Sequence, residues 1–183
     1  EYCGAPYAVA TTSCTTALLM CLQAIENKCK VIRIPKFTYV GVAQSIINAG
    51  FKVEFTDEVW VGSYELWPTN IIDSARHLTS GMYKPGTVVC LSCHWTKHLS
   101  VGQGGVILLD NFQKAEKLRR MRFDGRAQNV PAGEDKFTTP SYHAYMMPRD
   151  AAEGLTRLSL LPLHNEPLPN SAYPDLSLQE CFK

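Results

Sequence analysis

Apolar and polar positions along the 183-residue chain follow two periods, one typical of strands and one of helices. Short apolar runs predict strands at residues 7–10, 31–34, 52–56, 59–62, 70–73, 87–92 and 105–109. Apolar residues three and four apart predict helices at residues 17–25, 38–49, 111–123 and 148–160. Strands and helices therefore alternate, which favours an α/β layer with an at least partly parallel sheet.

Capping and breaking residues set the expected ends of these elements. The polar cluster TTSCTT precedes the first helix, and Pro35 stops the second strand. Thr38 is the expected N-cap of the second helix, and Gly50 its C-terminal stop. In the last helix the spacing predicts an inward face made of Ala151, Ala152, Leu155 and Leu158.

The length suits a single domain with at most a small appendage. We expect an α/β domain over residues 1–160. Beyond it, prolines at 162, 167, 169 and 174 and few aliphatic residues predict an extended tail over residues 161–183, which could wrap a partner subunit.

Composition adds few constraints. The net charge of +1 gives no reason to expect a nucleic-acid or membrane partner, and the longest apolar runs fall short of the roughly 20 residues of a spanning helix. The N-terminus lacks the pattern of a signal peptide, so we expect a cytoplasmic protein. Seven irregularly spaced cysteines indicate thiols that are mostly reduced and buried.

Polar residues of three kinds follow predicted strands, where α/β folds collect ligands. Residues 12–16 form a hydroxyl-rich helix start that suits a phosphate, Asp73 follows an apolar strand, and Ser92 precedes a loop containing Lys97. A lysine for a Schiff base, an aspartate for a pyridine nitrogen and a phosphate cradle are what pyridoxal phosphate (PLP) requires. Taken singly, the helix start is more often a cap and the aspartate more often a loop residue.

Two rival patterns favour other functions less well. Cys90 and Cys93 form a CxxC, a metal or redox spacing, but no second CxxC accompanies it. The basic residues of the third helix suggest a solvated helix face rather than an anion patch, because the whole chain is near neutral; they are Lys117, Arg119, Arg120 and Arg122.

The lysine segment SCHWTKHLSVGQGG resembles the motif S-F-H-x-x-K-x-x-x-x-G-E-G-G of the DegT-type (DegT/DnrJ/StrS) aminotransferases, PLP enzymes of fold type I that aminate nucleotide-linked keto-sugars. Other segments resemble further motifs of that family in the same order: SCTTAL, IPKFTYV, NIIDSARHL and AAEGLTRL. The resemblance covers residues 4–158. It implies a large domain with a mixed, mostly parallel sheet and flanking helices, strongly shortened, with the small C-terminal domain missing or reduced.

The resemblance also implies roles for individual residues. Lys97 would form the Schiff base and shuttle protons, Asp73 would pair with the pyridine nitrogen, and Tyr39 would stack on the cofactor face. The other implied cofactor contacts are Ser13, Cys14, Thr15, Ser92 and Arg76.

In this family a loop before the last matching helix reaches the neighbouring subunit's site, which implies a homodimer. His143 and Tyr145 are the candidates for that contact, although His143 could equally be an ordinary loop histidine.

Several positions depart from the pattern. Cys14 replaces a glycine, Arg76 a glutamine, His143 an asparagine and Gln103 a glutamate, and the chain between residues 57 and 73 is short by a strand and a helix. A turn without that glycine must avoid a positive φ.

The resemblance implies transamination, with glutamate as the plausible amino donor and a keto-sugar nucleotide as the acceptor. Lys97 argues against the dehydratase branch, where histidine takes this place. Two alternatives stay open: other PLP chemistry such as decarboxylation of an amino acid or amine, and a degenerate PLP-fold protein with a binding or structural role.

Overall fold

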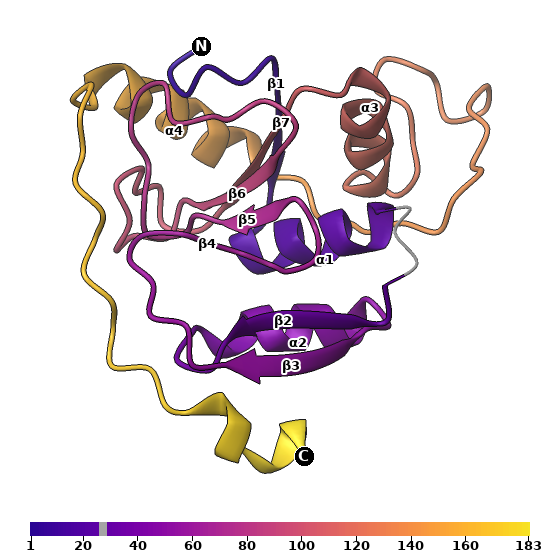
Figure 1. The fold of residues 1–183 in the computed structure, drawn as a ribbon. Helices are drawn as coiled ribbons and strands as arrows, with labels where there is room; N and C mark the ends of the chain where they lie inside the picture. The colour runs from indigo at the N-terminus through magenta and orange to yellow at the C-terminus, as the bar shows by residue number, and fades with distance from the viewer. Residues whose placement is uncertain (26–28) are drawn as a thin grey trace.

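The computed structural model describes residues 1–25 and 29–183. Its strands are β1 (Tyr7–Thr11), β2 (Val31–Pro35), β3 (Lys52–Thr56), β4 (Tyr64–Glu65), β5 (Ile71–Asp73), β6 (Val88–Ser92) and β7 (Gly105–Leu109). Its helices are α1 (Cys14–Ala24), α2 (Val40–Asn48), α3 (Phe112–Met121) and α4 (Pro148–Leu160), followed by 3₁₀ turns at Leu176–Leu178 and Glu180–Phe182 (Figure 1). The predicted alternation of strands and helices is confirmed. None of the described helices is long and apolar enough to cross a membrane.

The strands form a five-stranded sheet in the order β1-β7-β6-β5-β4 and a two-stranded sheet of β2 and β3. The α/β class with a mixed sheet is confirmed. The expectation of a mostly parallel sheet is wrong for the five strands, because only β5 and β6 pair in parallel and the other three pairings are antiparallel. Residues 66–70 between β4 and β5 are too few for the crossover of roughly a dozen or more residues that parallel neighbours require, whereas residues 74–87 between β5 and β6 are enough.

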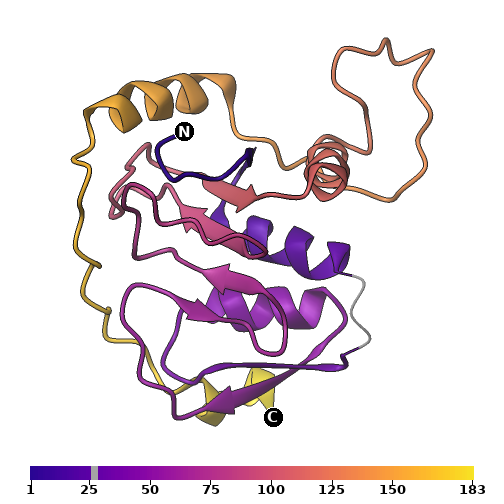
Figure 2. The ribbon, with the colours of Figure 1, turned by 45° about the horizontal axis from the view of Figure 1, so that its top comes forward.

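Two hydrophobic cores lie on the two faces of the five-stranded sheet. On β6, Cys90 belongs to the core shared with α1, whereas Leu91 belongs to the second core. On β7, Ile107 and Leu108 divide in the same way, and α4 covers part of the second core. Figure 2 shows α1 and α4 on opposite sides of these strands. Burial on both faces explains why the sequence of β6 is almost continuously apolar.

Three local predictions are corrected by the structure. Residues 59–62 are not a strand; the short strand comes later, as β4, and Val59 is 93% exposed. Tyr39, not Thr38, is the N-cap of α2, because the hydroxyl of Thr38 is bonded to Tyr64 instead.

The inward face of α4 also differs from the prediction. The helix buries Gly154, and its Ala151 and Leu158 pack against the second core. Leu155 is 71% exposed and Ala152 is exposed as well. The core contact therefore uses positions 151, 154 and 158, a narrower stripe than the one predicted.

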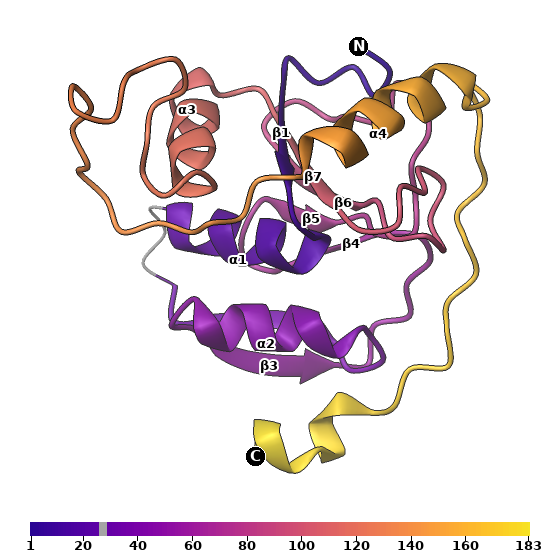
Figure 3. The ribbon, with the colours of Figure 1, turned by 180° about the vertical axis from the view of Figure 1, so that it is seen from behind.

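The C-terminal tail is extended up to Pro174, and it lies along its own chain from α4 to β3 (Figures 1 and 3). Leu176 anchors it: its side chain is 1% exposed, and its N–H donates to the carbonyl of Lys36 at 3.0 Å. The ring of Phe182 then packs edge-on against Phe55. The described contacts of this tail are intramolecular, and the contact with a partner subunit that its composition suggested stays a prediction.

Candidate active site

The N-terminus of α1 forms the first part of the site. The Oγ atom of Ser13 caps this helix by accepting the N–H of Thr16 at 3.0 Å. The N–H groups of Cys14 and Thr15 begin the helix and have no acceptor within it, so they are available to an anion. Cys14 is the first helical residue and has no positive φ, so the backbone does not need a glycine here.

Gly105 allows β7 to pack directly behind this helix end. A Cβ at this position would lie 2.4 Å from the carbonyl carbon of Ser13 and 2.5 Å from the nitrogen of Cys14. Gly105 also pairs with Thr11 of β1 and Ser92 of β6. Gly105 therefore has a steric role, because it lets the helix N-terminus lie against the end of β6 and the start of β7.

Asp73 lies at the end of β5 and is 5% exposed. Its Oδ1 accepts the N–H of Ala75 at 2.9 Å, and its Oδ2 accepts the hydroxyl of Tyr64 at 3.2 Å. Tyr64 is in turn 2.7 Å from the hydroxyl of Thr38. Burial raises the pKa of Asp73, whereas these hydrogen bonds and the charge of Lys97 oppose the rise. The carboxylate is positioned rigidly, but burial makes its charge costly.

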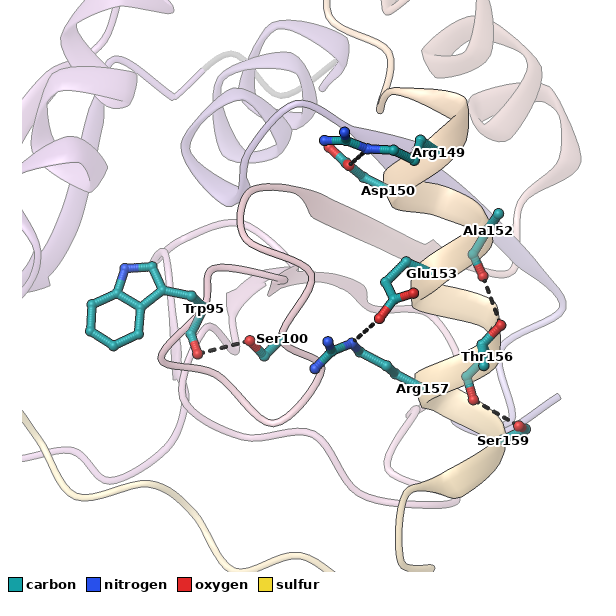
Figure 4. A network of polar contacts seen from close by, with 9 residues as sticks. All are labelled: Trp95, Ser100, Arg149, Asp150, Ala152, Glu153, Thr156, Arg157 and Ser159. Atoms are coloured by element: carbon teal, nitrogen blue, oxygen red, sulfur yellow. Dashed lines mark hydrogen bonds and ion pairs between the residues drawn. The ribbon is translucent and has the colours of Figure 1, made fainter.

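Lys97 lies in the loop between β6 and β7. Its N–H donates to the carbonyl of His94 at 2.9 Å, and the hydroxyl of Ser100 donates to the carbonyl of Trp95 at 2.8 Å (Figure 4). Burial lowers the pKa of the Lys97 amine, and the charge of Arg76 lowers it further, against the charge of Asp73. The neutral, nucleophilic form of the amine is therefore favoured relative to a free lysine.

Helix α4 supports the loop from one side. Gly154 sits so close to the loop that a Cβ there would be 3.4 Å from Cγ1 of Val101. On the same helix, Arg157 and Glu153 form an ion pair at 2.6 Å, drawn beside the loop in Figure 4. The lysine loop is thus held at both strand ends and by a helix.

These groups line one cavity of about 460 Å³. Of the site residues predicted from the sequence, it brings together Ser13, Cys14, Thr15, Tyr39, Asp73, Arg76, Ser92 and Lys97. Gln103, which departs from the family motif, lines it as well. His143 is not among them: its Nδ1 is 2.8 Å from Asp124 Oδ2, and its ring packs on Tyr145 at 4.8 Å. The side chain of His143 is 70% exposed, so its contact with a neighbouring subunit stays a prediction.

The residues of the cavity or its immediate support that the sequence analysis missed include Thr38 as a site residue, Trp60, Tyr64, Ser171 and Tyr173. Tyr64 carries the hydroxyl that bonds Asp73, and burial followed by the charge of Asp73 raises its pKa, so it stays a donor. Trp60 fell in a segment interpreted as a strand. Tyr173 and Ser171 belong to the tail, where an aromatic residue in an otherwise polar stretch was the available signal.

The CxxC spacing does not produce a paired thiol site. Cys90 belongs to the core around α1, where its Sγ is 3.8 Å from that of Cys21, and Cys93 belongs to the opposite core. Burial raises the pKa of Cys93 to about 12. Two protonated thiols on opposite faces of a sheet suit neither metal binding nor exchange chemistry. The expectation of buried cysteines is confirmed for Cys3, Cys14, Cys21, Cys90 and Cys93.

The basic residues of α3 are more engaged than a solvated face would be. Arg122 is half-buried and donates to the carbonyl of Ala10 at 2.6 Å, and Arg120 lies 3.5 Å from Asp135. Arg120 and Arg122 therefore hold neighbouring segments of the chain together.

The fold is that of the fold type I PLP-dependent aminotransferases. AtS13 from Actinomadura melliaura matches with a TM-score of 0.75 and 17% identity, over 86% of this chain and 56% of AtS13. A GDP-4-keto-6-deoxymannose-3-dehydratase, solved with a trapped PLP-glutamate geminal diamine, matches with a TM-score of 0.72 and 18% identity, over 87% of this chain and 58% of its own.

The chain belongs to the DegT/DnrJ/EryC1/StrS aminotransferase family, whose sequence profile matches residues 1–71 and 79–166. An uncharacterized protein of Methanocaldococcus jannaschii, MJ1066, is 25% identical over 71% of this chain and 45% of its own length. The chain thus spans about half the length of the relative and the solved structures that it matches.

Proposed function

We propose that this chain binds PLP and forms the cofactor-binding part of an aminotransferase. The observation that carries the proposal is the single cavity that joins a helix N-terminus, a buried carboxylate and a half-buried lysine. Its volume of about 460 Å³ lies in the range usual for small-molecule sites.

The residues present fit the chemical groups of PLP. The N–H groups at the start of α1 suit its phosphate, and the Lys97 amine suits its aldehyde. Asp73 suits the pyridine nitrogen. Burial raises the pKa of the Asp73 carboxyl, and a cationic N–H beside it would lower that pKa and stabilise the charged carboxylate. Tyr39, at the N-cap of α2 and on the cavity wall, is available to stack on the ring. When bound, PLP supplies an electron sink for carbon–hydrogen and carbon–nitrogen bond changes.

For the reaction, we propose transfer of an amino group from glutamate to a keto-sugar nucleotide. Lys97 Nζ would carry the proton between substrate and cofactor carbons, since its lowered pKa allows it to accept as well as donate. Support comes from the family and from the dehydratase structure, which contains glutamate joined to PLP. Our proposal includes a homodimer in which His143 and Tyr145 approach the partner's site. The cytoplasmic location stays a prediction.

The first test is covalent capture of the cofactor. Purified protein is mixed with PLP, reduced with borohydride and digested, and the modified lysine is found by mass spectrometry. We expect a visible absorption band and labelling of Lys97, both lost in Lys97→Ala and kept in Lys117→Ala, which alters an exposed residue of α3. Labelling spread equally over several lysines, or a band that persists in Lys97→Ala, would contradict the proposal.

Addition of L-glutamate to the PLP-loaded protein then tests the reaction. Transamination predicts that the band gives way to the spectrum of the amine form of the cofactor, with release of 2-oxoglutarate. Release of carbon dioxide from an amino acid would favour decarboxylation instead, and the absence of any labelled lysine would favour a binding or structural role.

A further inference from the structure

The guanidinium of Arg76 lies between the cavity and the C-terminal tail. Arg76 lines the cavity, its Nη1 donates to Ser171 Oγ at 3.1 Å, and its Nη2 donates to the carbonyl of Pro169. Its Nε is buried and has no hydrogen-bond partner. Within the part of the chain that the structure describes, this cation is therefore held by neutral oxygens alone, and its buried Nε–H is unused.

Residues 168–173 form a strap over this side of the cavity. At its start, the N–H of Leu168 donates to the carbonyl of Arg76 at 2.8 Å. Asn170 then donates to the carbonyl of Trp60 at 2.6 Å, and the ring of Tyr173 stacks on that of Trp60, with centroids 6.3 Å apart. Since Ser171 and Tyr173 also line the cavity, the strap is one of its walls.

The strap is held less firmly than the segment that follows it. Among the described residues, it makes three side-chain hydrogen bonds, one backbone bond to the rest of the chain and one ring stack, and Tyr173 also packs against the core around α1. Two of those side-chain hydrogen bonds come from Arg76. Beyond it, Leu176 is fully buried, and Lys36 forms an ion pair with Asp175 at 3.3 Å. The strap can therefore open while the tail stays anchored.

The charges on the cavity wall favour an anion near Arg76. Arg76 is the guanidinium cation of the wall, Lys97 is a second basic group whose pKa is lowered by burial and by Arg76, and Asp73 is the carboxylate. Asp73 directs its two oxygens to Ala75 and Tyr64, not to Arg76. A planar guanidinium prefers the two oxygens of a carboxylate, and such charge-assisted bonds are about twice as strong as bonds to neutral oxygens.

We propose that Arg76 binds a carboxylate of the substrate, and that the strap of residues 168–173 occupies Arg76 until that carboxylate displaces Pro169 and Ser171. The inference rests on the proposed function, since a carboxylate-bearing amino donor must enter the cavity. It assigns Arg76 to the substrate, whereas the family resemblance places this position at the cofactor. Ser171 and Tyr173 thereby become residues that restrict which substrates fit.

The test uses hydrogen exchange of the full chain, measured by mass spectrometry on peptides covering residues 164–176 and without PLP. Glutarate is the probe, because it carries two carboxylates and has no amino group to react. We expect glutarate to accelerate exchange in the strap several-fold and to leave the amide of Leu176 protected. In Arg76→Gln the strap should exchange quickly from the start and not respond.

Arg149→Gln is the matched control, since Arg149 is exposed on α4 and contacts only Asp150 among the described residues. It should keep both the protection and the response. Ser171→Ala removes one of the competing acceptors, so half-maximal opening should need roughly tenfold less glutarate. This second variant keeps the test sound if Arg76→Gln does not fold.

Three results would overturn the inference: strap exchange that ignores glutarate in the unmodified chain, an equal response in Arg76→Gln, or opening by inorganic phosphate at lower concentration than by glutarate. The last would assign Arg76 to a phosphate. Because these measurements contain no PLP, their failure is separate from failure of Lys97 labelling. In a catalytically active preparation, Arg76→Gln should raise KM for glutamate and retain labelling of Lys97.

Discussion

Gly105→Ala tests the contact that brings α1 to the site. The added methyl group would lie 2.4 Å from the carbonyl carbon of Ser13 and 2.5 Å from both the carbonyl oxygen of Ser13 and the nitrogen of Cys14. All three are backbone atoms, so no flexible side chain can move aside. Gly105 has no positive φ, so the expected effect is steric and not conformational.

Overpacking of this kind costs about 1–3 kcal/mol, which for a chain of this length lowers the melting temperature by roughly 2–12 °C. Relief of the clash must move the helix start away from β7. PLP affinity should therefore fall by more than the loss of stability explains, as measured by titration of the absorption band below the melting transition. Gly133→Ala is the control, because nothing lies within 4 Å of a Cβ there. Unchanged stability and unchanged PLP binding in Gly105→Ala would refute the reasoning.

Two further predictions concern Asp73 and the tail. Because burial raises the pKa of Asp73 above its unfolded value, the folded state gains from its protonation, and this stability is lost as the pH rises from about 4 through the folded pKa. Without PLP, Asp73→Asn should thus be at least as stable as the parent at pH 7. Denaturant titrations should show that its gain in free energy of unfolding over the parent shrinks toward pH 4, and a gain independent of pH would contradict this. The variant should also lose PLP binding. Leu176→Ala removes a buried side chain of the core around α1 worth about 2–5 kcal/mol, which should detach the tail, speed its hydrogen exchange and lower the melting temperature, whereas Leu178→Ala, at a 67% exposed position, should do none of these.

Much of the fold could be predicted because local pattern and tertiary burial agree. In β6 and β7 both faces of each strand are buried, so the apolar runs were unambiguous. The strand predicted at residues 59–62 is absent because this apolar run makes only an isolated bridge from Val61 to Ser63, and Val59 is exposed. In α4 the periodicity was correct, but the width of the buried stripe was set by the loop around Val101.

The sequence by itself predicted three of the residues that meet in the cavity. Ser13, Asp73 and Lys97 follow strands or cap a helix, and such positions converge at one sheet edge wherever strands and helices alternate. The order of the motifs along the chain also indicated the family, without any information on contacts.

The tertiary structure alone decided what surrounds those residues. The hydrogen bond from Tyr64 to Asp73, the packing of Gly105 on α1 and the strap held by Arg76 join segments that have no sequence relation to one another. Local periodicity reports which face of an element is buried and carries no information about its neighbour. For that reason the sequence indicates the loop in which Lys97 lies, and only the folded chain shows that its own C-terminal tail forms a wall of the same cavity.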